Sequence, residues 1–158
     1  MSPGLYYSRP RKLVGVSVIF RNGKGDFLIA KPTYREDWLF IGGIVDEEES
    51  PFAAALREVK EEIGLEFSSL PLLSICHASG DELVPDHLKF SFDGGVLTDE
   101  QINSIVLQES ELSEYKFLPL EKLEGLVTQR SFEVAQLALK SQETGKAYFL
   151  DSSGVVEI

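Results

Sequence analysis

The stretch from Gly43 to Leu65, GIVDEEESPFAAALREVKEEIGL, constrains the fold of this chain more than any other. Three acids near its end, Glu58, Glu61 and Glu62, stand at positions i, i+3 and i+4. On a helix these spacings place three carboxylates on one face, where like charges repel by a few tenths of a kcal/mol per pair. The pattern predicts either a solvated acidic surface or a site that binds a cation.

The helix that carries these acids has clear end signals. Ser50 is a suitable N-cap, Pro51 suits the first helical position, and Gly64 suits a C-terminal cap. Apolar residues at steps of three and four predict one buried face: Phe52, Ala55, Leu56, Val59 and Ile63. Upstream, the pair Gly42-Gly43 predicts a turn that joins an apolar segment to the helix.

Strand signals surround this helix. Alternating apolar residues and intervening turns predict the strands 14–20, 27–30, 38–41, 70–77, 88–92 and 115–118, and a closing hairpin over 147–158. Shorter helices are predicted over 98–104, where Thr98 and Gln101 form a capping-box pattern, and over 120–125 and 132–141. We expect a turn at 93–95, an acidic loop at 108–114, and a flexible arm at 1–12. Strands with two substantial helices indicate an α+β fold or an α/β sandwich.

Composition excludes several classes of function. The 158 residues predict one domain, and the formal charge of −11 disfavours binding of nucleic acid as a polyanion. A phosphate ligand would need metal ions or a few local cations. No apolar run is long enough for a transmembrane helix, so we expect no membrane partner. The single cysteine, Cys76, excludes an intrachain disulfide and fits a reducing, cytoplasmic location.

Nine positions of the stretch resemble the signature box of the Nudix (MutT-like) hydrolases. The box reads Gly, five residues, Glu, seven residues, Arg-Glu-aliphatic-any-Glu-Glu-any-Gly-aliphatic. The matching residues are Gly43, Glu49, Arg57, Glu58, Val59, Glu61, Glu62, Gly64 and Leu65. Ile41 departs from the common pattern, in which proline precedes the paired glycines. Nine residues at fixed spacing make this a specific signal.

The resemblance implies the Nudix α/β/α sandwich, a mixed β-sheet between helices, with the box as a catalytic loop–helix–loop. It implies that Glu58, Glu61 and Glu62, with the backbone carbonyl of Gly43, bind Mg²⁺, or Mn²⁺ in its place. Arg57 would orient the glutamates, with Glu49 as a partner. A metal-activated water would attack phosphorus in a nucleoside diphosphate linked to another moiety.

Other family members take a further metal ligand or general base from a downstream loop. By this comparison Glu109 is the first candidate and Glu111 the second, although either acid also fits an ordinary solvated loop.

Substrate contacts are expected from residues outside the box. The candidates are Lys31 and Arg35 for phosphate, Tyr34 for stacking, and His87; each also fits an ordinary surface position.

Two functions remain open at this point. The first is a Mg²⁺-dependent pyrophosphohydrolase acting on a small nucleotide, such as a nucleoside triphosphate, a nucleotide sugar, ADP-ribose or a dinucleotide. The second is a Nudix domain that senses a nucleotide without cleaving it. The presence of every box glutamate favours catalysis. The family resemblance also makes a homodimer an option.

Overall fold

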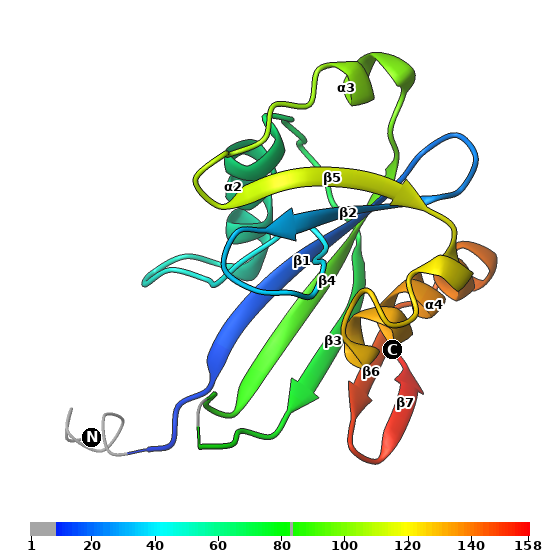
Figure 1. Cartoon of the computed structure of the whole chain (residues 1–158). Coiled ribbons are helices and arrows are strands. Elements are labelled where there is room, and N and C mark those ends of the chain that lie inside the picture. Colours follow the sequence, from blue (N-terminus) through cyan, green and yellow to red (C-terminus); the bar gives the residue numbers. More distant parts are fainter. Residues whose placement is uncertain (1–8, 83) are drawn as a thin grey trace.

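The fold is a twisted seven-stranded mixed sheet with helices on both faces, seen in a computed structural model that describes residues 9–82 and 84–158 (Figure 1). The strand order is β5-β2-β1-β4-β3-β6-β7. Their bounds are β1 Leu13–Arg21, β2 Phe27–Pro32, β3 Leu72–Ala78, β4 His87–Val96, β5 Leu112–Leu118, β6 Tyr148–Asp151 and β7 Gly154–Glu157. The β1–β4 and β3–β6 pairs are parallel, and the other pairs are antiparallel.

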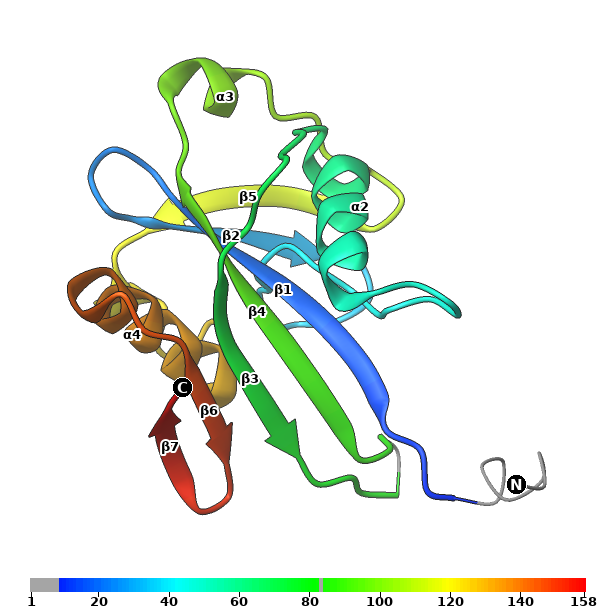
Figure 2. The same ribbon diagram turned by 180° about the vertical axis from the view of Figure 1, so that it is seen from behind.

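In residues 9–82 and 84–158, three α-helices and one 3₁₀ helix accompany the sheet. They are α2 Pro51–Ile63, α3 Asp99–Asn103, α4 Gln129–Thr144 and the 3₁₀ helix η1 Leu120–Lys122. In Figures 1 and 2, α2 and α4 lie on opposite faces of the sheet. None of the helices in the described part of the chain is long and apolar enough to cross a bilayer.

The two faces of the sheet follow from the alternation of β1. Val16, Val18 and Phe20 point to one side and pack with Ala55 and Val59 of α2. Side chains on a strand alternate between its two faces, so the residues between these three face the other way. There, Ile19 belongs to a second core cluster with residues of η1 and α4. The expected α/β/α sandwich is therefore confirmed.

The end signals of α2 are confirmed. The Ser50 hydroxyl accepts from the Ala53 N–H at 3.1 Å, Pro51 begins the helix, and Gly64 ends it at φ 73°. The capping box of Thr98 and Gln101 at α3 is also present.

Several local predictions were wrong. Residues 38–41 form no strand; Leu39 and Ile41 make isolated bridges to β2 and β1. Residues 93–95 form no separate turn but lie inside β4, where the Phe20 ring occupies the space that a Cβ on Gly94 would fill. The predicted helix 120–125 is reduced to η1, and β5 takes over the end of the acidic loop from residue 112. Of the expected arm 1–12, residues 1–8 lie outside the described residues.

Candidate active site

The turn before α2 is bound directly to β1. The Val16 N–H donates to the Gly43 carbonyl at 2.8 Å, and the Val18 N–H donates to the Ile41 carbonyl at 2.7 Å. Gly42 has φ 147°, and a Cβ on it would lie 2.2 Å from the Val16 carbonyl oxygen, so only glycine fits. These contacts hold the paired glycines flat against the central strand.

Two carboxylates of α2 pack on these glycines. The Gly42 N–H donates to Glu62 Oε2 at 2.8 Å. A Cβ on Gly43 would lie 2.3 Å from Glu58 Oε1, so the Glu58 carboxylate occupies space that any other residue would fill. Glu58 and Glu62 are buried, at 8% and 6% exposure, whereas Glu61 on the same helix face is exposed. The solvated-surface interpretation of the acidic trio therefore fails for two of its three members.

Arg57 organises the acids through five hydrogen bonds. Its Nε and Nη2 contact the Glu49 carboxylate at 2.9 and 3.0 Å, and Nη1 contacts Glu58 at 2.9 Å and Glu61 at 3.1 Å. Nη2 also donates to the Ile44 carbonyl at 3.1 Å. The bond to Glu49 is the largest cause of the raised pKa of Arg57, and it likewise lowers the pKa of Glu49. The geometry agrees with the predicted pairing of Arg57 and Glu49.

Burial and crowding disfavour the ionised forms of the inner carboxylates. Burial, with the nearby charges of Glu58 and Glu111, raises the pKa of Glu62 to about 8, although the Gly42 N–H opposes the shift. Burial also raises the pKa of Glu58, against the opposing effect of Arg57. A cation bound beside these carboxylates would stabilise their ionised forms.

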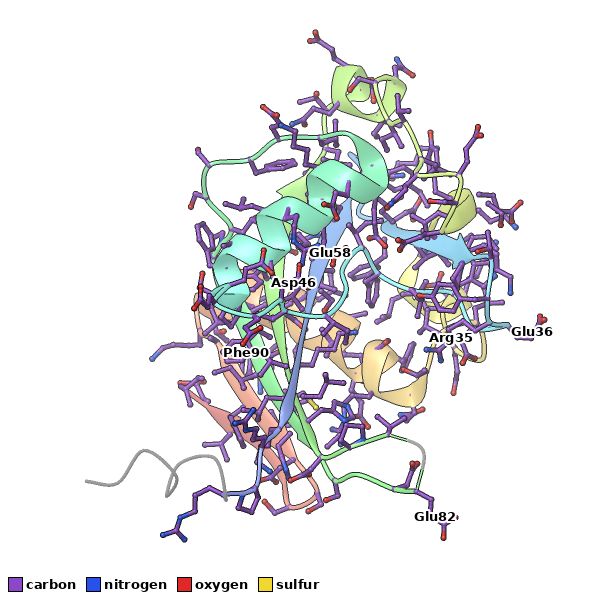
Figure 3. The ribbon with its side chains drawn as sticks, turned by 90° about the vertical axis from the view of Figure 1, so that its left-hand side faces the viewer. Arg35, Glu36, Asp46, Glu58, Glu82 and Phe90 are labelled. Atoms are coloured by element: carbon purple, nitrogen blue, oxygen red, sulfur yellow. The ribbon has the colours of Figure 1, made fainter. Side chains whose placement is uncertain are left out.

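The arrangement fits a hard divalent cation that takes oxygen ligands. The Gly43 carbonyl accepts one hydrogen bond and keeps a second lone pair. As the side chains stand in the described ranges, no three His, Cys, Asp or Glu groups converge on one point. Arg57 instead supplies the positive charge that contacts Glu58 and Glu61. Figure 3 shows Glu58 on α2, with Asp46 in the loop before the helix.

The downstream acids lie on a loop tied to the end of α2. The Gln108 N–H donates to the Glu62 carbonyl at 3.1 Å, and the Glu111 carbonyl accepts from the Thr33 N–H at 2.8 Å. Glu111 and Glu109 are both exposed. The Glu111 charge contributes to the raised pKa values of Glu58 and Glu62, which places its carboxylate within electrostatic reach of the site.

A cavity of about 310 Å³ opens beside the paired glycines. Three of the four predicted substrate contacts line it, namely Tyr34, Arg35 and His87. The fourth, Lys31, lies in a neighbouring open depression and donates to the backbone carbonyl of Arg35 at 3.2 Å. Figure 3 shows Arg35 on the loop after β2, away from α2.

Sequence reasoning missed Lys89, a cavity residue on β4. A signal existed in the alternation of that strand: Phe90 and Phe92 face the α2 side, whereas Lys89 and Ser91 alternate with them. A polar stripe on a central strand indicates a lined cavity as readily as a solvated face.

The NUDIX domain profile matches residues 11–138, so the chain belongs to the NUDIX domain family. An RNA pyrophosphohydrolase of Hydrogenovibrio crunogenus is 41% identical over 58 residues, which are 37% of this chain and 35% of that protein. The matched segment thus spans about a third of this curated relative.

Solved structures share the fold. The MutT protein of Methanosarcina mazei Go1 has a TM-score of 0.70 at 23% identity, over 85% of this chain and 99% of that one. The NUDIX domain of Shewanella oneidensis NrtR, complexed with ADP ribose, has a TM-score of 0.67 at 16% identity, over 91% and 99%. The observed sandwich is therefore the fold of MutT and Nudix proteins.

Proposed function

We propose that the protein is a Mg²⁺-dependent hydrolase that cleaves the phosphoric anhydride of a nucleoside diphosphate linked to another moiety. One observation carries this proposal: the buried carboxylates of Glu58 and Glu62 are packed against Gly42 and Gly43 at the edge of a ligand-sized cavity. A purely structural role leaves two costly buried acids unexplained, because well-packed apolar residues would stabilise the same helix face better.

The cation would be held by Glu58, Glu61, Glu62 and the Gly43 carbonyl. When bound, it supplies a water of lowered pKa and neutralises charge on the phosphoryl oxygens. The protein's own part is to hold these oxygens rigidly. Arg57 keeps Glu58 and Glu61 in place through its bonds to both, and Glu49 in turn fixes Arg57. In the reaction, the water oxygen bonds to phosphorus, the bridging P–O bond breaks, and a carboxylate accepts the proton.

We assign that proton transfer, or a further metal contact, to the loop 108–111. Glu111 has the better support, because its charge acts on both Glu58 and Glu62. Glu109 remains the candidate that the family comparison favours. Glu111→Gln and Glu109→Gln separate the two: the variant of the true participant should lose about a hundredfold or more in kcat, the usual contribution of general acid–base catalysis. Equal, near wild-type kcat in both variants would remove this loop from the chemistry.

Candidate substrates are the small nucleotides named above, together with the end of an RNA. The RNA end enters because curated relatives are named RNA pyrophosphohydrolases. The formal charge of −11 argues for a contact limited to the terminal nucleotide, since a longer polyanion would be repelled.

The alternative, a domain that binds a nucleotide without cleaving it, has support from the ADP-ribose complex of the similar NUDIX domain. The deciding experiment screens a panel of diphosphate compounds with Mg²⁺, Mn²⁺ or EDTA and measures product release. We expect turnover only with metal. If nothing is cleaved while a nucleotide raises the melting temperature, the binding function replaces the hydrolase.

Glu62→Gln tests the site itself. The change removes one metal ligand, and kcat should fall by orders of magnitude while the melting curve stays cooperative. Glu66→Gln is the matched control, because Glu66 is exposed just beyond the helix and pairs only with Lys60 among the interactions found in residues 9–82 and 84–158. Normal turnover in Glu62→Gln would refute the metal assignment. One domain over residues 1–158, a cytoplasmic location and a homodimer stay predictions.

A further inference from the structure

Two side chains of β4 face the cavity from the same side of the strand. His87 and Lys89 are two residues apart, so both point to one face of the sheet, and both line the 310 Å³ cavity. The other walls near them are apolar, with Leu39, Phe40 and Val84. A mostly apolar cavity with a few polar groups is typical of a site that selects its ligand by hydrogen bonds.

The amine-bearing side chain of Lys89 lines this cavity. In the described part of the chain, no hydrogen bond or ion pair engages its Nζ, and burial lowers its pKa. The other strong cation of the cavity, Arg35, is already bound to Asp37 at 2.6 Å. The amine of Lys89 therefore offers N–H donors to whatever occupies the cavity.

His87 offers a hydrogen-bond acceptor to the same cavity. Its Nδ1 lies 3.1 Å from the Pro85 carbonyl oxygen, which can only accept, so Nδ1 carries the proton. In the neutral ring Nε2 is then an acceptor. The two residues thus present a donor beside an acceptor along one strand.

When the exocyclic group of a base lies at Lys89 and its ring nitrogen lies at His87, this pair is complementary to a carbonyl that adjoins a ring N–H. Guanine offers O6 and N1–H, and uracil offers O4 and N3–H. Adenine and cytosine have the reverse order, an amino donor beside an unprotonated ring nitrogen. A phosphate fits the cavity less well, because a doubly charged group among apolar walls would meet only one unpaired cation.

We propose that a base enters this cavity with its exocyclic group at Lys89 and its ring nitrogen at His87, which makes the cavity selective for the oxo bases guanine or uracil over the amino bases adenine and cytosine. The proposal rests on the proposed function, since it names the base of the nucleotide that the same site would cleave. Lys89 binds the carbonyl oxygen and His87 accepts from the neighbouring N–H. Both are specificity-determining residues, distinct from the carboxylates that would hold the cation.

The test is calorimetric binding of four α,β-methylene diphosphates, those of guanosine, uridine, adenosine and cytidine, in the presence of Mg²⁺. Wild type should bind the guanosine and uridine compounds about tenfold or more tightly than their amino counterparts, the usual value of one good base contact. The guanosine and uridine arms then distinguish a purine from a pyrimidine site.

Lys89→Met should weaken the oxo compounds about tenfold and the amino compounds less than threefold. Lys89→Arg should keep most of the preference, because it retains the donors. Lys24→Met, in an exposed turn, is the control and should bind as wild type does. The proposal is overturned if wild type shows no oxo preference, if none of the four compounds binds, or if Lys89→Met weakens all four equally.

Failure of the proposed function would look different. The methylene bridge cannot be hydrolysed, so binding selectivity does not depend on turnover. Selective binding without cleavage of any natural diphosphate refutes the hydrolase and leaves the base preference intact. Cleavage with no base preference refutes only the inference about Lys89 and His87. Melting temperatures of all variants, measured without ligand, show whether a weakened site reflects a damaged fold.

Discussion

Glu62 makes the metal-free protein sensitive to pH in a calculable way. Its pKa is about 8 in the folded chain against 4.5 for the free side chain. The folded state holds this proton to a higher pH than the unfolded state does. The contribution of Glu62 to the free energy of unfolding is therefore fully present below pH 4.5 and is lost as pH rises towards 8. At 1.36 kcal/mol per pKa unit, the loss between pH 5 and 7 is about 2–3 kcal/mol.

The perturbation is Glu62→Gln, which stays neutral and still offers an oxygen to the Gly42 N–H. In EDTA, urea unfolding of wild type should show the free energy of unfolding falling by about 2–3 kcal/mol from pH 5 to 7. The variant should lose most of this dependence and should exceed wild type in stability at pH 8. The control is Glu66→Gln. The bond to Lys60 lowers the pKa of Glu66, so this carboxylate stays ionised from pH 5 to 7 and the variant should keep the wild-type profile. Parallel profiles for wild type and Glu62→Gln would refute the argument.

Two further substitutions test the frame of the site. Arg57→Lys should lower the free energy of unfolding in urea by about 1–3 kcal/mol and should lower kcat. An ammonium group cannot replace the two-bond contact with Glu49 or the other three hydrogen bonds. A loss under about 0.5 kcal/mol would show that these contacts contribute little. Gly42→Ala should cost more than about 3 kcal/mol or abolish folding, since its Cβ would lie 2.2 Å from the Val16 carbonyl oxygen at φ 147°. Gly23→Ala, where a Cβ meets nothing within 4 Å, is its control, and equal melting temperatures of the two variants would contradict the steric reasoning.

Local signals predicted the parts of the fold that depend on neighbouring residues. The ends of α2 followed from Ser50, Pro51 and Gly64, and the final hairpin followed from its turn. The segment 38–41 was misassigned because its backbone bonds to two different strands through single bridges, which no local pattern reveals.

In the site, too, local spacing predicted some features and only the packing showed the others. Helical spacing put Glu58, Glu61 and Glu62 on one face, but it could not show that two are buried and one exposed, which depends on the contact with Gly42 and Gly43. Lys89 was missed because a lysine in a strand usually reaches solvent, and only the packing of the sheet shows that this one enters a cavity.

The bond between the Val16 N–H and the Gly43 carbonyl has a consequence for substrate length. Val16 and Gly43 both line the cavity, and Gly43 also lies against the carboxylate of Glu58, so this hydrogen-bonded pair joins the cavity wall to the acids. The separation between the pocket and the acids is therefore set by backbone and cannot adjust to the ligand. In the proposed hydrolase, a molecule held in the cavity would present whichever phosphorus lies at that separation, so the number of atoms between its bound group and the phosphoric anhydride would determine which compounds are substrates.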